Sequence, residues 1–368
     1  MDFKEKKVIE IAEIWKSVRG IGRIGTMNLL EKIKNDVYVI AEMSANHAGK
    51  IENAFQIIEE AAKAGADCVK IQTYTADTLT INCQDEPYII KGGLWDGYNY
   101  YQLYQEATTP WEWHGALKQK CEEVGVDFLS TPFDRTAVDF LEELEVEFYK
   151  IASFELVDIP LIEYVASKGK PIIMSCGMGS IDEIQEALDA CRRQNNDKIV
   201  LLKCCSQYPA QFEDMNVSVI QDMKGRFGVP VGLSDHSFGA LAPVIAVSLG
   251  AQVIEKHVCL NREIESPDSG FSMEMKEFAE MVQDVRNASI IKGRPTYALT
   301  EHEKNGLSSR RSLVAVSDIA QGEPFTADNV RSIRPAIGIK PKYYSELLGR
   351  KAKKAYQFGE PIRMEELQ

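Results

Sequence analysis

The sequence predicts an α/β protein, a (β/α)8 barrel followed by a small C-terminal domain. Three observations lead to this fold class. From residue 37 onward, eight short β-branched apolar runs alternate with amphipathic segments of helical length. The runs are apolar at consecutive rather than alternate residues, which is typical of parallel strands buried on both faces. Eight such units within about 260 residues match a closed barrel in number and length.

The predicted strands and helices follow one another in regular order. The strands are VYVIAE, DCVKIQTY, VDFLSTPF, FYKIAS, KPIIMS, KIVLLKCC, VPVGLSDH and QVIEKHV. The predicted helices between them include ENAFQIIEEAAKAG, TAVDFLEELE, LIEYVASKGK, IDEIQEALDACRRQ, NVSVIQDMKGRFG and FGALAPVIAVSLG. Several of these end in glycine, which a helix C-cap favours. An open doubly wound sheet is the alternative, but no Gly-x-Gly-x-x-Gly motif opens the first unit.

Changes of pattern along the chain predict its domain organisation. Four ranges are expected: an N-terminal extension (1–35), the barrel (36–293), a linker (294–307) and a separate small domain (308–368). The extension contains one segment, 7–18, that could form an amphipathic helix. Within the barrel, residues 74–110 are unusually long for a strand-to-helix connection. Connections of that length at a barrel rim are commonly lids or specificity loops.

Composition excludes several classes of function. The net charge of -13 argues against nucleic acid as a partner, since a phosphate backbone requires a basic surface. No apolar run is long enough for a membrane helix, and the first residues lack the apolar core of a signal peptide. We therefore expect a cytoplasmic protein in which the eight cysteines remain reduced. Residues 308–368 carry 11 Lys and Arg against 7 Asp and Glu, so the tail is basic and the body acidic.

Polar residues gather where the predicted strands end. In a barrel of this kind the chemistry lies where strands run into their following loops. Unpaired charges are costly there, so their concentration at strand ends indicates an enzyme. In strand order the residues are Glu42, Ser44, Asn46 and His47; Lys70 and Gln72; Ser130 and Thr131; Lys150, Ser153 and Glu155; Ser175; Ser206 and Tyr208; Ser234, Asp235 and His236; and Glu255 and His257.

Two kinds of site can be built from these residues. Residues two apart on a strand share a face, so Glu255 and His257 point the same way. Because the seventh and eighth strands are neighbours, His236 and His257 can converge on a divalent metal completed by water and substrate oxygens. Hydrogen-bonding core histidines are the alternative. The strand-end lysines and hydroxyls suit a phosphate and a carboxylate.

The chain resembles a known family through several ordered runs. IAEMSANHAGKIENA, GADCVKIQTY, STPFD, YKIASFE, KCCSQYP, VGLSDHS and IEKHVCL resemble the sialic acid synthase family. The C-terminal region is similar to the antifreeze-like SAF domain of those enzymes. SANHAG, YTADTLT and IIKGGLWDG resemble the pseudaminic branch rather than the N-acetylneuraminate branch. The resemblance implies a transferase that condenses phosphoenolpyruvate with 2,4-diacetamido-2,4,6-trideoxy-L-altrose and releases phosphate.

The resemblance also implies residue roles. His236 and His257 would hold Mn²⁺ or Mg²⁺. Phosphoenolpyruvate would be bound by Lys70, Thr131, Lys150, Ser153, Ser175 and Ser234, and the sugar by Gln72, Tyr208 and Asp268. Glu42 and Glu155 are the candidate catalytic carboxylates, and which of them activates water is left open. Arg334 matches the arginine that the SAF domain inserts into the partner subunit's barrel, which implies a domain-swapped homodimer.

Two positions depart from related enzymes. Ser206 stands where the neuraminate branch has an asparagine. Met43 and Ser44 occupy the place of a cysteine ligand in related metal-dependent synthases, so no thiolate ligand is expected.

Other functions remain open at this point. One alternative is an N-acetylneuraminate or legionaminate synthase. Another is a Schiff-base aldolase or lyase with Lys150 or Lys70 as the nucleophile. A third is a non-catalytic protein that binds sugar through its C-terminal domain.

Overall fold

The computed structural model describes residues 28–368 and divides the chain into two compact units with the boundary between Gly293 and Arg294. The amphipathic segment predicted at 7–18 lies outside the described residues. Within the described part, no helix is long and apolar enough to cross a lipid bilayer.

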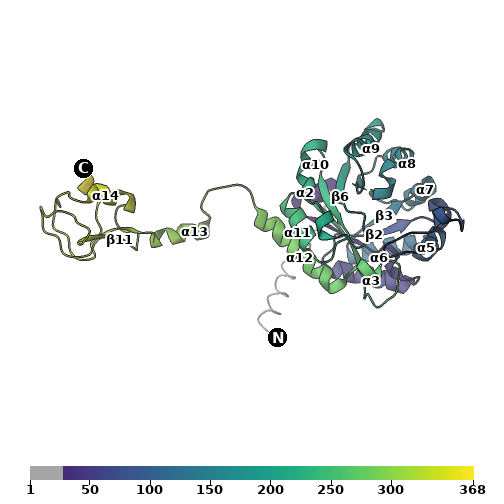
Figure 1. The fold of residues 1–368 in the computed structure, drawn as a ribbon, viewed down its shortest axis with the longest axis horizontal. Coiled ribbons are helices and arrows are strands. Elements are labelled where there is room, and N and C mark those ends of the chain that lie inside the picture. Colours follow the sequence, from purple (N-terminus) through teal and green to yellow (C-terminus); the bar gives the residue numbers. More distant parts are fainter. Residues whose placement is uncertain (1–27) are drawn as a thin grey trace. The chain divides into compact units, whose positions relative to one another are not determined.

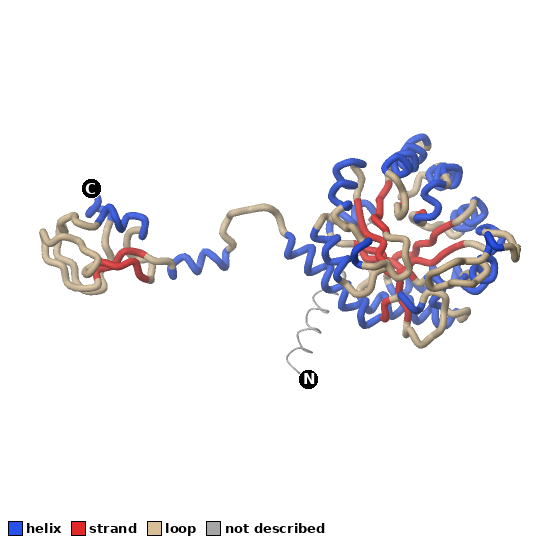
Figure 2. Tube along the Cα trace, in the orientation of Figure 1, coloured by secondary structure: helices blue, strands red, loops and turns tan. Residues whose placement is uncertain are grey.

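The first unit is a barrel of parallel strands with helices around it (Figures 1 and 2). Hydrogen bonds join its strands in the order β3-β2-β1-β8-β7-β6-β5-β4, and β3 and β4 contact each other to close the ring. The strands are β1 Tyr38–Glu42, β2 Cys68–Thr73, β3 Asp127–Pro132, β4 Tyr149–Ile151, β5 Ile172–Ser175, β6 Ile199–Cys204, β7 Val231–Asp235 and β8 Val253–Cys259. The predicted (β/α)8 barrel is confirmed.

A helix follows each strand and packs on the outside of the barrel. These helices are α3 Ile51–Ala64, α6 His114–Val124, α7 Arg135–Glu143, α8 Ile159–Ala166, α9 Ile181–Arg193, α10 Val219–Phe227, α11 Leu241–Ser248 and α12 Met275–Lys292. Local sequence sets their ends. Asp134 accepts hydrogen bonds from the first backbone N–H groups of α7, and Ser180 forms a capping box at α9. Gly65, at φ 95°, ends α3 in the left-handed conformation that glycine adopts at low cost.

Helix α2 (Leu29–Asn35) packs against the end of the barrel at which the strands begin. Leu29 and Ile33 are buried in one apolar cluster with the interior residues Ile40 and Ile173. Gln252, just before β8, donates from Nε2 to the carbonyl oxygen of Ile33 at 2.9 Å. Although it falls in the range expected to be an extension, α2 is part of the barrel's packing. Because α2 covers the end at which the strands begin, a substrate site is expected at the opposite end of the barrel.

Residues 74–110, which form most of the long connection between β2 and α6, are called the arm from here on. It contains two short helices, α4 Ala76–Leu79 and α5 Tyr100–Ala107. Its tip is a tight turn in which Ile90 N donates to Tyr98 O and Gly97 N donates to Ile90 O, both at 2.8 Å. The arm is therefore hydrogen-bonded within itself along much of its length.

The second unit is a small β-containing domain. It contains α13 Glu301–Asn305, an antiparallel pair of strands, β10 Ser312–Ala315 and β11 Val330–Ile333, and α14 Tyr344–Leu347. Leu313, Phe325, Tyr356 and Ile362 belong to a separate apolar core. The prediction of a distinct C-terminal domain is confirmed.

Candidate active site

The inward face of β8 changes from apolar to polar along the strand. On β8, Val253 belongs to the apolar cluster at the base. Glu255, two residues later, reaches across the barrel to Lys150 on β4. His257 follows after two more residues on the same face. The period of two thus places charged groups directly above an apolar floor.

Two lysines and two glutamates form a buried cluster at this level. Lys150 Nζ donates to both carboxylate oxygens of Glu255, at 2.8 and 2.9 Å. Lys70 Nζ lies 2.9 Å from Glu42 Oε2 and 3.2 Å from Glu255 Oε1. None of the four side chains is more than 4% exposed. The four groups form one continuous ion-pair network, which compensates for the cost of burying each charge.

The network shifts the pKa values of its members in different directions. Burial alone would raise the pKa of Glu255, but Lys150 and Lys70 hold it well below its ordinary value. Burial raises the pKa of Glu42 in spite of the neighbouring Lys70. Burial lowers the pKa of Lys150 despite its contact with Glu255. Glu255 is therefore the permanent counter-ion of the cluster, and Glu42 is the carboxylate that protonates more easily.

The predicted hydroxyl groups surround this cluster. Thr131 Oγ1 accepts from Lys70 Nζ at 3.4 Å, and Ser234 Oγ donates to Glu255 Oε1 at 3.2 Å. Ser153 Oγ accepts from Gly177 N at 3.1 Å. The buried Ser175 Oγ has no hydrogen-bond partner among the described residues. A buried hydroxyl without a partner is available to a ligand.

The two strand-end histidines lie together above the cluster. The ring centroids of His236 and His257 are 5.3 Å apart, with an interplanar angle of 64°. His236 Nδ1 lies 2.9 Å from the carbonyl oxygen of Cys205, so Nδ1–H donates there and Nε2 keeps its lone pair. Burial and the neighbouring His236 hold the pKa of His257 well below its ordinary value. Its buried Nδ1 has no hydrogen-bond partner among the described residues.

Aromatic rings flank the histidine pair. The ring centroid of Tyr208 lies 4.3 Å from that of His236 and 6.3 Å from that of His257. The ring centroid of Phe271 lies 4.9 Å from that of His257 and 5.1 Å from that of Tyr208. Trp95, from the tip of the arm, continues this layer with its ring centroid 5.4 Å from that of Tyr208.

The remaining barrel residues take up positions at the same rim. Gln72 Nε2 donates to Glu42 Oε1 and to Ser44 Oγ, both at 3.1 Å. Asp268 Oδ2 accepts from Ala45 N at 3.3 Å, and burial raises the pKa of Asp268. These contacts join the polar groups that follow β1 and β2 to the loop after β8.

Glu155 lies in the short 3-10 turn after β4, Ser153–Val157. Burial raises the pKa of its carboxyl to about 7. Its Oε2 is buried with no hydrogen-bond partner among the described residues. A carboxyl group with a pKa near neutrality can both accept and donate a proton.

Arg334 belongs to the second unit. With Arg310 and Arg311 it lines a hollow of about 470 Å³. Of the other histidines, His114 is buried on α6, and its Nε2 lies 2.9 Å from Thr73 Oγ1. That contact agrees with a structural role for His114.

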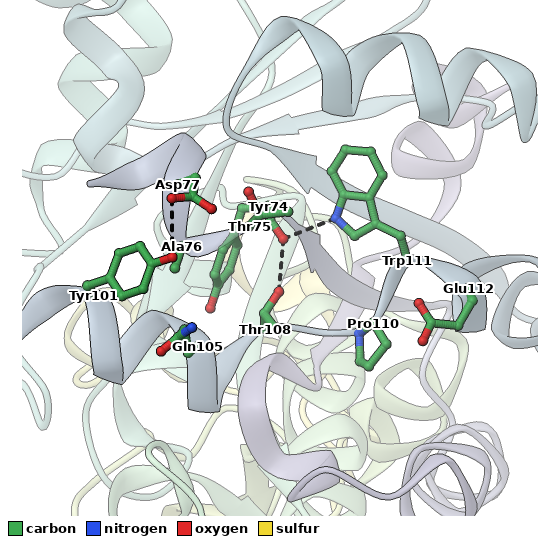
Figure 3. Close-up of a pocket in the computed structure, with 10 residues that line it drawn as sticks. All are labelled: Tyr74, Thr75, Ala76, Asp77, Tyr101, Gln105, Thr108, Pro110, Trp111 and Glu112. Atoms are coloured by element: carbon green, nitrogen blue, oxygen red, sulfur yellow. Dashed lines mark hydrogen bonds between the residues drawn. The ribbon is translucent and has the colours of Figure 1, made fainter. Parts of the chain in front are cut away.

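A second hollow, of about 490 Å³, lies at the base of the arm (Figure 3). None of the predicted substrate or metal residues lines it. The carbonyl oxygen of Tyr74 accepts there from Thr108 Oγ1 at 2.8 Å and from Trp111 Nε1 at 3.0 Å. These bonds tie the last residues of the arm, and Trp111 just after it, to the arm's first residue.

Three residues of the site were not selected from the sequence. The sequence placed Glu255 on the same strand face as His257, but we gave it no role. The signal was available, because the two buried lysines, Lys70 and Lys150, require a counter-ion. Trp95 lies in the run IIKGGLWDG, whose resemblance to the pseudaminic branch pointed to the loop but not to this residue, and Phe271 carried no signal. Nothing in a linear pattern places an aromatic residue of a long connection beside a histidine on another strand.

Comparisons with known proteins agree with the fold. The NeuB family matches residues 57–297, and the SAF domain matches residues 310–368. The chain is 46% identical over 346 residues to the pseudaminic acid synthase of Campylobacter jejuni subsp. jejuni serotype O:2, covering 94% of this chain and 100% of that protein. It is 42% identical over 332 residues to the pseudaminic acid synthase of Helicobacter pylori, covering 90% and 97%. The crystal structure of the N-acetylneuraminic acid synthetase of Leptospira borgpetersenii matches with a TM-score of 0.67 at 32% identity, covering 74% of this chain and 90% of that one.

Proposed function

The chain belongs to the NeuB family, and from that premise we propose that it condenses phosphoenolpyruvate with 2,4-diacetamido-2,4,6-trideoxy-L-altrose to form pseudaminic acid and release phosphate. The observation that carries the chemistry is that one end of the barrel gathers two imidazoles, two buried lysines and a row of hydroxyl groups. The choice of sugar is supported by the near full-length similarity to two pseudaminic acid synthases.

The donor set fits a divalent metal held by two imidazoles. His236 keeps Nε2 free because its Nδ1–H is bound to a carbonyl group, and the buried Nδ1 of His257 has no hydrogen-bond partner in the described part of the chain. The described residues contain no group of three or more His, Cys, Asp or Glu side chains that could hold a metal. Water and substrate oxygens would therefore have to complete the coordination. When bound, Mn²⁺ or Mg²⁺ would polarise the sugar aldehyde as a Lewis acid.

Lys70 and Lys150 would bind the anionic groups of phosphoenolpyruvate. Both ammonium groups are held in place by Glu255, so they need little rearrangement when the anion arrives. Ser175 offers a buried hydroxyl that no other described residue engages, and Thr131, Ser153 and Ser234 provide further hydroxyl groups. Together these residues would fix both the phosphate and the carboxylate of the substrate.

Proton transfer is assigned to Glu42 and Glu155, and both remain candidates for activating water. The pKa of Glu42 is raised by burial, and that of Glu155 lies at about 7. Glu155 can therefore change its protonation state near neutral pH, and Glu42 is protonated more readily than an exposed carboxylate. Gln72, which donates to Glu42, would contact the sugar together with Tyr208 and Asp268.

The second unit would complete the site of another subunit. Arg334 would reach the barrel of the partner subunit and contact its sugar, which makes the enzyme a domain-swapped homodimer. The excess of basic residues in 308–368 over an acidic body supports this arrangement.

The function is tested with a panel of N-acetylated sugars. Phosphate release from phosphoenolpyruvate is measured with 2,4-diacetamido-2,4,6-trideoxy-L-altrose, the corresponding legionaminate precursor and N-acetylmannosamine. We expect the 6-deoxy diacetamido-altrose to give the highest kcat/KM and a nine-carbon product by mass spectrometry. Faster consumption of N-acetylmannosamine would assign the chain to the neuraminate branch instead.

A further inference from the structure

The arm brings one large apolar side chain to the edge of the histidine pair. The ring centroid of Trp95 lies 5.4 Å from that of Tyr208 and 6.4 Å from that of Phe271. Those two rings in turn pack against His236 and His257. Trp95 therefore extends an unbroken aromatic layer from the proposed metal site outward to the arm.

Trp95 is held in this position from two sides. Its Nε1–H donates to the carbonyl oxygen of Pro267 at 2.9 Å, in the loop that also contains Asp268 and Phe271. The turn that carries it is closed by Gly92 N, which donates to Asp96 Oδ1 at 2.5 Å. Gly92, Gly93 and Gly97 all have φ between 75° and 84°, a backbone that other residues adopt only with strain.

The hydrogen bond to Pro267 has a chemical consequence. Because the single polar group of the indole is already engaged, Trp95 offers a ligand only its apolar face. Phe271 has no polar group at all. An aromatic face of this kind favours methyl groups, and a hydroxyl group placed against it loses its hydrogen bonds to water without compensation.

We infer that Trp95 is a specificity-determining residue, the wall of the sugar site that selects a methyl group over a hydroxymethyl group at C6 of the substrate. This inference rests on the proposed function, in which the aldehyde of the sugar lies at the histidine pair. The far end of the sugar then extends toward the arm. An apolar wall rejects an added hydroxyl group by about 100-fold at most, so the selectivity that it provides is moderate.

The test uses two sugars that differ in one hydroxyl group, the 6-deoxy sugar 2,4-diacetamido-2,4,6-trideoxy-L-altrose and its 6-hydroxy counterpart. The selectivity ratio is kcat/KM for the 6-deoxy sugar divided by kcat/KM for the 6-hydroxy sugar. Wild-type enzyme is expected to favour the 6-deoxy sugar. Trp95→Ala should lower the ratio about tenfold, mainly by raising KM for the 6-deoxy sugar. Trp95→Gln should lower it further by improving use of the 6-hydroxy sugar, and KM for phosphoenolpyruvate should stay unchanged in both variants.

Tyr98→Ala is the matched control. Tyr98 lies on the same arm and is 45% exposed, so its removal should leave the ratio as in wild type. Trp95 variants that lower turnover of both sugars equally would show a purely structural role and overturn the inference. If Trp95→Ala does not fold, the selectivity ratio of Trp95→Gln tests the inference: an unchanged ratio overturns it. Wild-type enzyme that turns over N-acetylmannosamine but neither diacetamido sugar would instead overturn the proposed function.

Discussion

Single residues in this site differ in how firmly their charge is fixed. Glu255 accepts from Lys150 and Ser234 and lies 3.2 Å from Lys70, so its carboxylate stays ionised. Glu155 Oε2 has no hydrogen-bond partner among residues 28–368, and burial, with the neighbouring Asp158, raises the pKa of this carboxyl to about 7. The site therefore separates a permanent counter-ion from a carboxyl group able to exchange protons.

The raised pKa of Glu155 predicts a pH-dependent contribution to stability. Between about pH 4.5 and 7 the folded protein binds a proton at Glu155 that the unfolded chain releases, so the free energy of unfolding falls as pH rises through this window. Glu155→Gln removes that dependence. Relative to wild type, we expect the variant to gain on the order of 2 kcal/mol between pH 5 and 8, measured by urea unfolding.

The control for this experiment is Glu186→Gln on the exposed side of α9, which should follow the wild-type profile. A Glu155→Gln profile parallel to that of wild type would show that Glu155 does not titrate in this range. The same variant should also remove one ionisation near pH 7 from the profile of kcat/KM if Glu155 is the group that moves the proton.

At the level of strands and helices, the alternation of side chains along each strand could be predicted from the sequence. The contacts across the barrel could not. The alternation on β8 places Glu255 and His257 on one face, and in the structure both side chains point into the barrel. The Lys150–Glu255 pair joins residues 105 positions apart, and no local pattern encodes that partnership. The contact between Trp95 and Tyr208 was missed for the same reason, because it depends on how the arm folds back over the rim.

Close packing between strands predicts a sharp difference between two glycines. A Cβ atom at Gly232 on β7 would lie 2.3 Å from the carbonyl oxygen of Val253 and 2.6 Å from Leu202 Cδ2. Backbone cannot move aside cheaply, so Gly232→Ala should destabilise the barrel by about 3 kcal/mol. The matched control, Gly225→Ala in α10, meets nothing within 4 Å and should stabilise by about 1 kcal/mol. Equal midpoints for the two variants in thermal unfolding would contradict this account of the barrel.

Over the whole molecule, the distribution of charge is the basis of the proposed domain swap. The last 61 residues are basic and contain Arg310, Arg311 and Arg334 around one hollow, while the rest of the chain is acidic. The existence of two units could be predicted from the change of pattern after the eighth repeat. Which barrel Arg334 would enter under the proposed swap could not, since that depends on assembly rather than on any segment of one chain.

Mixing two defective variants tests the domain swap. Arg334→Ala lacks the arginine but keeps an intact barrel, and His236→Ala lacks a histidine but keeps an intact C-terminal domain. Each variant alone should therefore be nearly inactive at low sugar concentration, because every site misses one group. In a swapped mixed dimer, one barrel with intact histidines receives the arginine of the other chain. Unfolding and refolding equal amounts together should therefore restore about a quarter of wild-type activity. Activity that stays at the level of the separate variants would place Arg334 in its own barrel or away from the site.

The central claim is that the paired imidazoles serve a condensation at the barrel mouth. The most direct test measures phosphate release from phosphoenolpyruvate and the 6-deoxy diacetamido sugar, first after a chelator is added and then after Mn²⁺ is returned. The account predicts that release stops with chelator and resumes with Mn²⁺ in wild type, and that His257→Ala stays inactive throughout. Undiminished phosphate release in excess chelator would contradict it.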